Sequence, residues 1–184
     1  DDITCTGCND ISAFNYNCLP GNLPQNGGVS GCGDDIVIGD ESCIYTPEGF
    51  EFNQSTLQAF YLVDNASMDD EPLDSYQDWI GIFNGDICVG SWPWQGDIEY
   101  TTIPAMGNDG EDYALGYMEP GDVPSFKIYD ASENEIYDAN PSAQYPWSNL
   151  SFNIIALLNG YSTYSYTIAL NDGPNLVSFY ALPD

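Results

Sequence analysis

The feature that most constrains the fold is one hairpin pattern near the middle of the chain. Residues 79–90 read WIGIFNGDICVG, in which two runs rich in β-branched and aromatic residues flank Asn84-Gly85. The Asn-Gly pair suits the positive φ angles of a type I′ turn, so this segment predicts a tight β-hairpin. From Thr46 onward the chain continues as short apolar stretches separated by turns, which is typical of an antiparallel β domain.

Two apolar stretches support this interpretation to different degrees. In STLQAFYLVD, residues 55–64, apolar side chains occupy both alternating sets of positions. A strand with two apolar faces is covered on both sides, so we expect a central strand of a sandwich. NLSFNIIALL, residues 149–158, is an apolar run whose pattern leaves open a strand or a short helical turn.

Two further hairpins complete the predicted β domain. One is expected over residues 125–139, and the other over residues 161–183, where apolar residues alternate on both sides of Asn-Asp-Gly. We therefore expect about eight to ten strands and little helix. The predicted fold is an all-β, antiparallel β-sandwich, Ig-like or jelly-roll-like, over residues 46–184.

Residues 1–45 have a different character, with many turn formers and no sustained periodicity. They hold five of the six cysteines, and this density suits disulfides formed in an oxidising compartment. A zinc site is the alternative, but only one Cys-x-x-Cys pair is present and the chain has no histidine. We predict a disulfide-stapled, loop-rich appendage that uses Cys5, Cys8, Cys18, Cys32, Cys43 and Cys88.

The charge of the chain excludes several classes of partner. It has 29 acidic residues, a single basic residue, Lys127, and a formal net charge of −28. Binding to nucleic acid or to an anionic membrane surface requires Lys and Arg, so neither is expected. No apolar run approaches the roughly 20 residues of a membrane helix, so no membrane insertion is expected. A chain that begins at Asp1 without Met suits a mature, secreted product.

Catalysis is also not expected. Without histidine, the familiar nucleophile–base pairs and proton shuttles are unavailable. A pair of carboxylates is able to hydrolyse a glycoside, but among 29 acids some pair falls at a suitable separation by chance. The sequence therefore predicts a protein that is not an enzyme.

Two segments of the appendage carry a resemblance. GCNDISAFNYNC, residues 7–18, and GDESCIY, residues 39–45, resemble a repeat of large secreted, cell-surface multidomain proteins of marine bacteria, with Ile11 in place of Pro and Glu41 in place of Gly. DWIGIFNGDICVG and NLVSFYALPD are similar to a β module that recurs beside those repeats. The resemblance implies an extracellular location and a modular role, and it implies no catalytic residues.

The resemblance also implies one pattern of disulfides among the many that six cysteines allow. If the first and last cysteines of the repeat pair, Cys8 bonds to Cys43. Cys18 and Cys32 then pair within the inserted loop. Cys5 and Cys88 remain, and a bond between them attaches the appendage to the sandwich.

Two hypotheses of function follow. The first is an extracellular structural or adhesive subunit that assembles with copies of itself, or with neighbouring modules, into a filament or surface array. Its docking element is the alternating strand of residues 175–184, acting by strand addition. That assembly strand contains Leu176, Ser178, Phe179 and Tyr180.

The alternative is a carbohydrate-binding module that binds a polysaccharide. Trp92-Pro-Trp94 follows the predicted hairpin and is expected in a loop, where exposed indoles stack on sugar rings. The competing interpretation is that both indoles pack beneath the loop or in a subunit interface.

Calcium is the expected cofactor, because 29 acids repel one another in a compact state unless cations or salt offset the repulsion. Carboxylate and carbonyl oxygens are the ligands that Ca²⁺ prefers. The competing interpretation is a solvated acidic coat. The candidate ligands are Asn108, Asp109, Glu111 and Asp112 in one loop; Asp64, Asp69 and Asp70, with Glu71 and Asp74, in a second segment; and Asp34, Asp35 and Asp40, with Glu41, in the appendage. Three glycosylation sequons begin at Asn53, Asn65 and Asn149.

Overall fold

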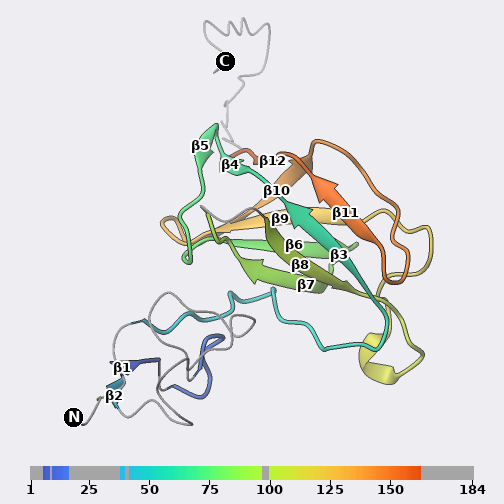
Figure 1. The fold of residues 1–184 in the computed structure, drawn as a ribbon, viewed down its shortest axis with the longest axis horizontal. Coiled ribbons are helices and arrows are strands. Elements are labelled where there is room, and N and C mark those ends of the chain that lie inside the picture. Colours follow the sequence, from blue (N-terminus) through green and yellow to red (C-terminus); the bar gives the residue numbers. More distant parts are fainter. Residues whose placement is uncertain (1–5, 9, 17–37, 40–41, 97–99, 163–184) are drawn as a thin grey trace, which may run out of the picture.

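The computed structural model describes residues 6–8, 10–16, 38–39, 42–96 and 100–162, and two packed β-sheets dominate it (Figure 1). This confirms the predicted all-β sandwich. The described part of the chain contains one 3₁₀ turn, η2 (Asp112–Ala114), and no α-helix. No described helix is long and apolar enough to cross a membrane.

The larger sheet has seven strands in the order β5-β4-β12-β10-β9-β6-β7, and the smaller has three in the order β11-β3-β8. A short parallel pair, β1 (Thr6–Gly7) and β2 (Ile38–Gly39), lies in the appendage. The large sheet consists of β4 (Ala66–Met68), β5 (Glu71–Pro72), β6 (Trp79–Asn84), β7 (Ile87–Pro93), β9 (Ser125–Asp130), β10 (Glu135–Pro141) and β12 (Leu158–Gly160). The small sheet consists of β3 (Gln58–Val63), β8 (Thr101–Met106) and β11 (Phe152–Ile155).

The main core fills the space between the two sheets. Alternate residues of β3, including Tyr61, point inward and are fully buried. They meet the inward residues of the large sheet, and the rings of Tyr61 and Phe126 lie 5.7 Å apart in an edge-to-face arrangement. Each fully buried aliphatic or aromatic side chain contributes roughly 1.5–3 kcal/mol, so this layer is the main source of stability. As predicted, β3 is the central strand of its sheet.

Parallel strand pairs connect the two sheets at one corner. β3 pairs in parallel with β11, and β4 pairs in parallel with β12 in the same register, from Phe60↔Phe152 to Met68↔Gly160. Hydrogen bonds from Asp64 N–H to Ile155 O and from Leu158 N–H to Asn65 O, both 2.9 Å, continue the ladder around the corner. Both sheets are therefore mixed, and the prediction of a purely antiparallel sandwich needs this correction.

The local hairpins agree with the sequence, with one change of turn. β9 and β10 form the hairpin expected over residues 125–139. β6 and β7 also pair as expected, but Asn84 pairs with Ile87, so the two turn residues are Gly85 and Asp86. Only Gly85 has a positive φ, of 60°, which fits a type II′ turn rather than the predicted type I′. Residues 149–158 resolve as β11 and the start of β12, and the hairpin predicted over 161–183 lies almost wholly outside the described residues.

A second cluster covers the outer face of β6 and β7. It contains Phe50, Trp79, Phe83 and Cys88, all buried. From the appendage, the ring of Phe14 meets Trp79 edge to face, with ring centroids 5.0 Å apart. The appendage therefore packs on the sandwich through an aromatic contact.

Candidate functional site

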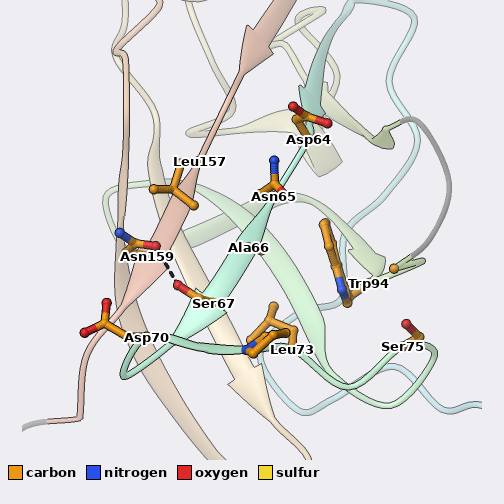
Figure 2. A pocket seen from close by; sticks show the side chains of 12 residues that line it. Asp64, Asn65, Ala66, Ser67, Asp70, Leu73, Ser75, Trp94, Leu157 and Asn159 are labelled. Carbon is orange, nitrogen blue, oxygen red and sulfur yellow. Dashed lines mark hydrogen bonds between the residues drawn. The ribbon is translucent and has the colours of Figure 1, made fainter.

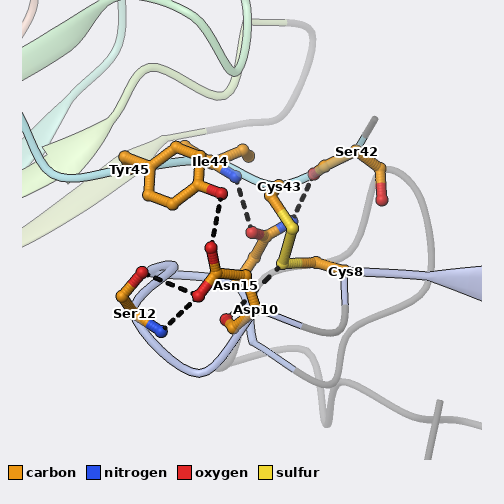
Figure 3. Close-up of a disulfide and its surroundings, with 8 residues drawn as sticks. All are labelled: Cys8, Asp10, Ser12, Asn15, Ser42, Cys43, Ile44 and Tyr45. Carbon is orange, nitrogen blue, oxygen red and sulfur yellow. Dashed lines mark hydrogen bonds between the residues drawn. A yellow bond between two sulfur atoms is a disulfide. The ribbon is translucent and has the colours of Figure 1, made fainter. Parts of the chain in front are cut away.

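The appendage is held at residues 8–16 and 42–45 by a disulfide and an asparagine (Figure 3). Cys8 and Cys43 form the disulfide that the repeat implies. Asn15 is buried, donates from Nδ2 to Ser42 O and accepts from Ile44 N–H, both at 2.7 Å. One side chain thus joins two segments of the repeat, and this gives Asn15 a structural role.

Asp10 closes the same unit from the other side. Its Oδ1 accepts the backbone N–H and the hydroxyl of Ser12, and its Oδ2 accepts the hydroxyl of Tyr45 at 2.9 Å. These hydrogen bonds hold the pKa of Asp10 below its ordinary value, with the Ser12 hydroxyl as the largest cause. Asp10 and Tyr45, both part of the repeat pattern, therefore act as structural partners.

Cys88 departs from the expected disulfide framework. It lies in β7 beneath Phe50, and its thiol is free and buried. Sγ donates to Phe50 O at 3.4 Å, and burial raises the pKa of the thiol to about 11. The prediction that Cys88 forms a disulfide is wrong, because the strand turns this side chain into an apolar cluster. Cys5, Cys18 and Cys32 lie outside the described residues.

The two tryptophans do not form an exposed platform. β7 extends through Pro93, which pairs with Trp79, so Trp92 lies in a strand and Trp94 directly follows it. Trp92 packs against Phe14 with ring centroids 4.7 Å apart, and Trp94 is only 6% exposed. The expectation of exposed indoles in a loop is therefore wrong, and the interpretation that they pack into the molecule is correct.

In the acidic loop at residues 108–112, the candidate ligand Asp109 accepts hydrogen bonds from neighbouring residues. Oδ2 of Asp109 accepts the backbone N–H and hydroxyl of Thr56, both at 3.0 Å, and the hydroxyl of Tyr113 at 2.9 Å; Oδ1 accepts Glu111 N–H. These hydrogen bonds, with the Thr56 N–H as the largest cause, hold the pKa of Asp109 well below its ordinary value. Asn108 similarly accepts Gly110 N–H. Asp109 is therefore a loop anchor.

The second acidic segment forms a turn. Asp69 and Asp70 are the two residues between β4 and β5, with φ angles of 50° and 67°, the pattern of a type I′ turn. Asp69 Oδ1 accepts Ser162 N–H at 3.0 Å. Across the described ranges, no group of three or more His, Cys, Asp or Glu side chains is arranged to hold a metal ion. Asp34, Asp35 and Asp40, and the predicted assembly strand with Leu176, Ser178, Phe179 and Tyr180, lie outside the described residues.

A cavity of about 500 Å³ lies over β4, and we call it the Trp94 pocket. Figure 2 shows Trp94 on one side of β4, and Leu157 and Asn159 on the other. Asp64 and Asp70 stand at the two ends of the strand. The sequence singled out Trp94 and both acids, but not their placement around one cavity.

The outer face of the small sheet is a second candidate site, which we call the outer apolar face. The register places Phe152, Phe60 and Pro104 in one row, and Ile154, Leu62 and Thr102 in the next. Phe152 is 70% exposed and Ile154 50% exposed, and the rings of Phe60 and Phe152 stack with centroids 5.0 Å apart. None of these six side chains is charged. For β3, the apolar residues on both sides of the strand predict that the side with Phe60 and Leu62 is covered, whereas the structure leaves both residues partly exposed.

The search for similar proteins found no matching family model, curated protein or solved structure.

Proposed function

We propose that the chain is an extracellular structural module that assembles with copies of itself through the outer apolar face. The observation that best supports this proposal is the stacked pair Phe60 and Phe152 on the outer surface of the small sheet, where Phe152 is largely exposed. Contiguous exposed apolar patches mark interaction sites in soluble proteins. Among the described residues β11 is an edge strand of the small sheet, and the backbone groups of an edge strand suit strand addition.

The charge of the chain supports a second copy as the occupant. Two copies that each carry a formal charge of −28 repel one another over most of their surfaces. The outer apolar face offers two rows of side chains that carry no charge, so contact between these rows brings no carboxylates of theirs together. Self-association through this face is therefore opposed less than contact between two acidic surfaces.

Two other features support an extracellular setting. The Cys8–Cys43 disulfide is compatible with an oxidising compartment. The resemblance of residues 7–18 and 39–45 to repeats of secreted surface proteins points the same way. The three sequon asparagines, Asn53, Asn65 and Asn149, are exposed, and glycosylation there stays a prediction.

We also propose that Ca²⁺ binds to this acidic chain and stabilises it. Glu111 and Asp112 are exposed and their carboxylates make no hydrogen bond to any described residue, so they stay available to a cation. Melting with and without chelator at constant ionic strength tests this part. A drop in melting temperature that Ca²⁺ restores and NaCl does not supports bound calcium. Melting that follows total salt alone contradicts it.

The assembly proposal is tested by sedimentation velocity and electron microscopy of the full chain over a range of concentrations. Phe152→Ser should abolish assembly, whereas the control Leu115→Ser, at a residue 67% exposed elsewhere on the surface, should leave it unchanged. Deleting residues 175–184 tests the predicted assembly strand in the same assay. A native chain that stays monomeric throughout, or a Phe152→Ser variant that assembles like the native chain, contradicts the proposal.

A further inference from the structure

The Trp94 pocket has the size and rigidity of a ligand site. Its volume of about 500 Å³ falls within the roughly 300–1,000 Å³ of small-molecule sites. Its walls are fixed by backbone hydrogen bonds on both sides. Trp94 N–H donates to Asp78 O at 2.8 Å, and Tyr76 N–H donates to Trp94 O at 2.7 Å. On the other side, the parallel pairing of β4 and β12 places Ser67 beside Asn159. The site is therefore formed before any ligand arrives.

The floor of the pocket is apolar. Ala66, Leu73 and Trp94 line it and are all nearly buried. The side chain of Leu157, 40% exposed, extends this apolar surface toward the rim. Such a floor suits the carbon-bound hydrogens of a sugar ring, which pack on aromatic and aliphatic surfaces.

The rim holds both donors and acceptors that have no partner among the described residues. The Ser67 hydroxyl donates to Asn159 Oδ1 at 2.6 Å, which leaves the two N–H groups of Asn159 Nδ2 unused. At the floor, the indole N–H of Trp94 likewise has no partner in the described part of the chain. The carboxylates of Asp64 and Asp70 accept no hydrogen bond from a described residue.

This combination selects the chemistry of the ligand. The two carboxylates repel an anion. A simple cation satisfies the carboxylates, but leaves the N–H groups of Trp94 and Asn159 unused. Hydroxyl groups both donate and accept, so a polyol is able to pair with the carboxylates and with the N–H groups alike. We infer that the Trp94 pocket binds a neutral saccharide unit, with its ring over Trp94 and Leu73 and its hydroxyls on Asp64, Asp70 and Asn159.

This inference is independent of the proposed assembly, because the pocket and the outer apolar face share no residue. The experiment measures binding to the full chain by tryptophan fluorescence and saturation-transfer NMR. The probes are the neutral disaccharides cellobiose, lactose, maltose and mannobiose, with digalacturonate and choline as charged controls. We expect saturable binding of at least one neutral disaccharide, and none of digalacturonate or choline. Absence of saturable binding by all four neutral probes overturns the inference, as does preferential binding of choline.

Variants then locate the binding. Asp64→Ala removes an exposed acceptor and should weaken binding by at least about tenfold, the effect of losing a charged hydrogen bond of about 1.4 kcal/mol. Trp94→Phe keeps most of the packing but removes the N–H donor, and should weaken binding similarly. Asp86→Asn, at the exposed hairpin turn, is the matched control and should bind like the native chain. If Trp94→Phe does not fold, Asp64→Ala decides alone. Unchanged binding by Asp64→Ala overturns the assignment, and Phe152→Ser should bind sugar normally whether or not it assembles.

Discussion

The ring of Phe50 packs over Gly81, and substitutions at these two residues test how the side of the sandwich that faces the appendage is packed. Phe50 is fully buried, and its ring meets Phe83 edge to face with centroids 5.5 Å apart. A Cβ placed on Gly81 would lie 2.8 Å from Cε1 of Phe50 and 2.6 Å from Cε2 of Phe83. Gly81→Ala therefore forces both rings to move.

The magnitudes follow from the geometry. Gly81→Ala overpacks a filled site and should lower the free energy of unfolding by about 1–3 kcal/mol. Phe50→Ala leaves a cavity and should lower it by about 3–5 kcal/mol. In the double variant the new methyl group enters space that the Phe50 ring has vacated. The double variant should therefore lose less than the sum of the two single losses, with a coupling of about 1 kcal/mol.

Urea unfolding followed by tryptophan fluorescence measures the four free energies, provided that the slope with urea stays constant. The control cycle combines Phe50→Ala with Gly107→Ala. A Cβ on Gly107 would meet Trp147 at 2.4 Å and Leu57 at 3.1 Å, so it displaces other residues than a Cβ on Gly81 does. That pair should be additive within about 0.5 kcal/mol. Additivity in the Phe50 and Gly81 cycle as well would refute the packing argument.

Three further predictions concern single positions. Asp109→Asn should lower the melting temperature at neutral pH and make the decrease of melting temperature in acid less steep. The lowered native pKa of Asp109 stabilises the fold above the unfolded pKa, and this stabilisation is lost as pH falls through the native pKa. Melting as a function of pH checks the prediction, and a variant whose melting temperature falls in acid as steeply as that of the native chain contradicts it. Cys8→Ser removes the disulfide that closes a loop with a sequence separation of 35, and it should destabilise the appendage by about 4 kcal/mol. Limited proteolysis checks this, and a variant whose residues 1–45 resist the protease as well as those of the native chain contradicts it. Gly90→Ala would place a Cβ 1.6 Å from the backbone oxygen of Pro104 and should cost about 3 kcal/mol or more; a native urea midpoint contradicts it.

The parts of the fold that the sequence predicted are those set by neighbouring residues. The hairpins β6–β7 and β9–β10 follow from alternating side chains on either side of a tight turn. Even there, the turn moved by one residue, because Asn84 pairs with Ile87 and leaves Gly85 to supply the positive φ. The apolar residues on both sides of β3 predicted a central strand, and β3 does lie between β11 and β8, although only its inner side is fully buried.

The parts that the sequence missed depend on contacts between distant segments. The parallel pairing of β3 with β11 joins residues such as Phe60 and Phe152, and no local pattern encodes such a pairing. For the same reason, the sequence predicts a covered face for the outer residues of β3, which are partly exposed in the structure. The position of Cys88 beneath Phe50 likewise depends on residues 44–52 folding back over β7, and the cysteine spacing contains no sign of this.

The acids of this chain are compatible with a packed sandwich because of where they lie. Asp69, Asp70 and Asp109 occupy turns or loops, where they set backbone geometry or accept backbone hydrogen bonds. Asp78 is an exception: it is 5% exposed, it accepts the N–H groups of Ala131 and Asp74, and burial raises its pKa. A raised native pKa favours the protonated form, so Asp78 lowers stability as pH rises above its unfolded pKa, opposite in sign to Asp109. Exposed acids also lie on strand faces, as Asp138 does in β10, so an incoming copy meets less repulsion on a strand face that carries no acid. The outer apolar face is such a surface, and its position on the open side of the small sheet is the reason to seek the assembly contact there.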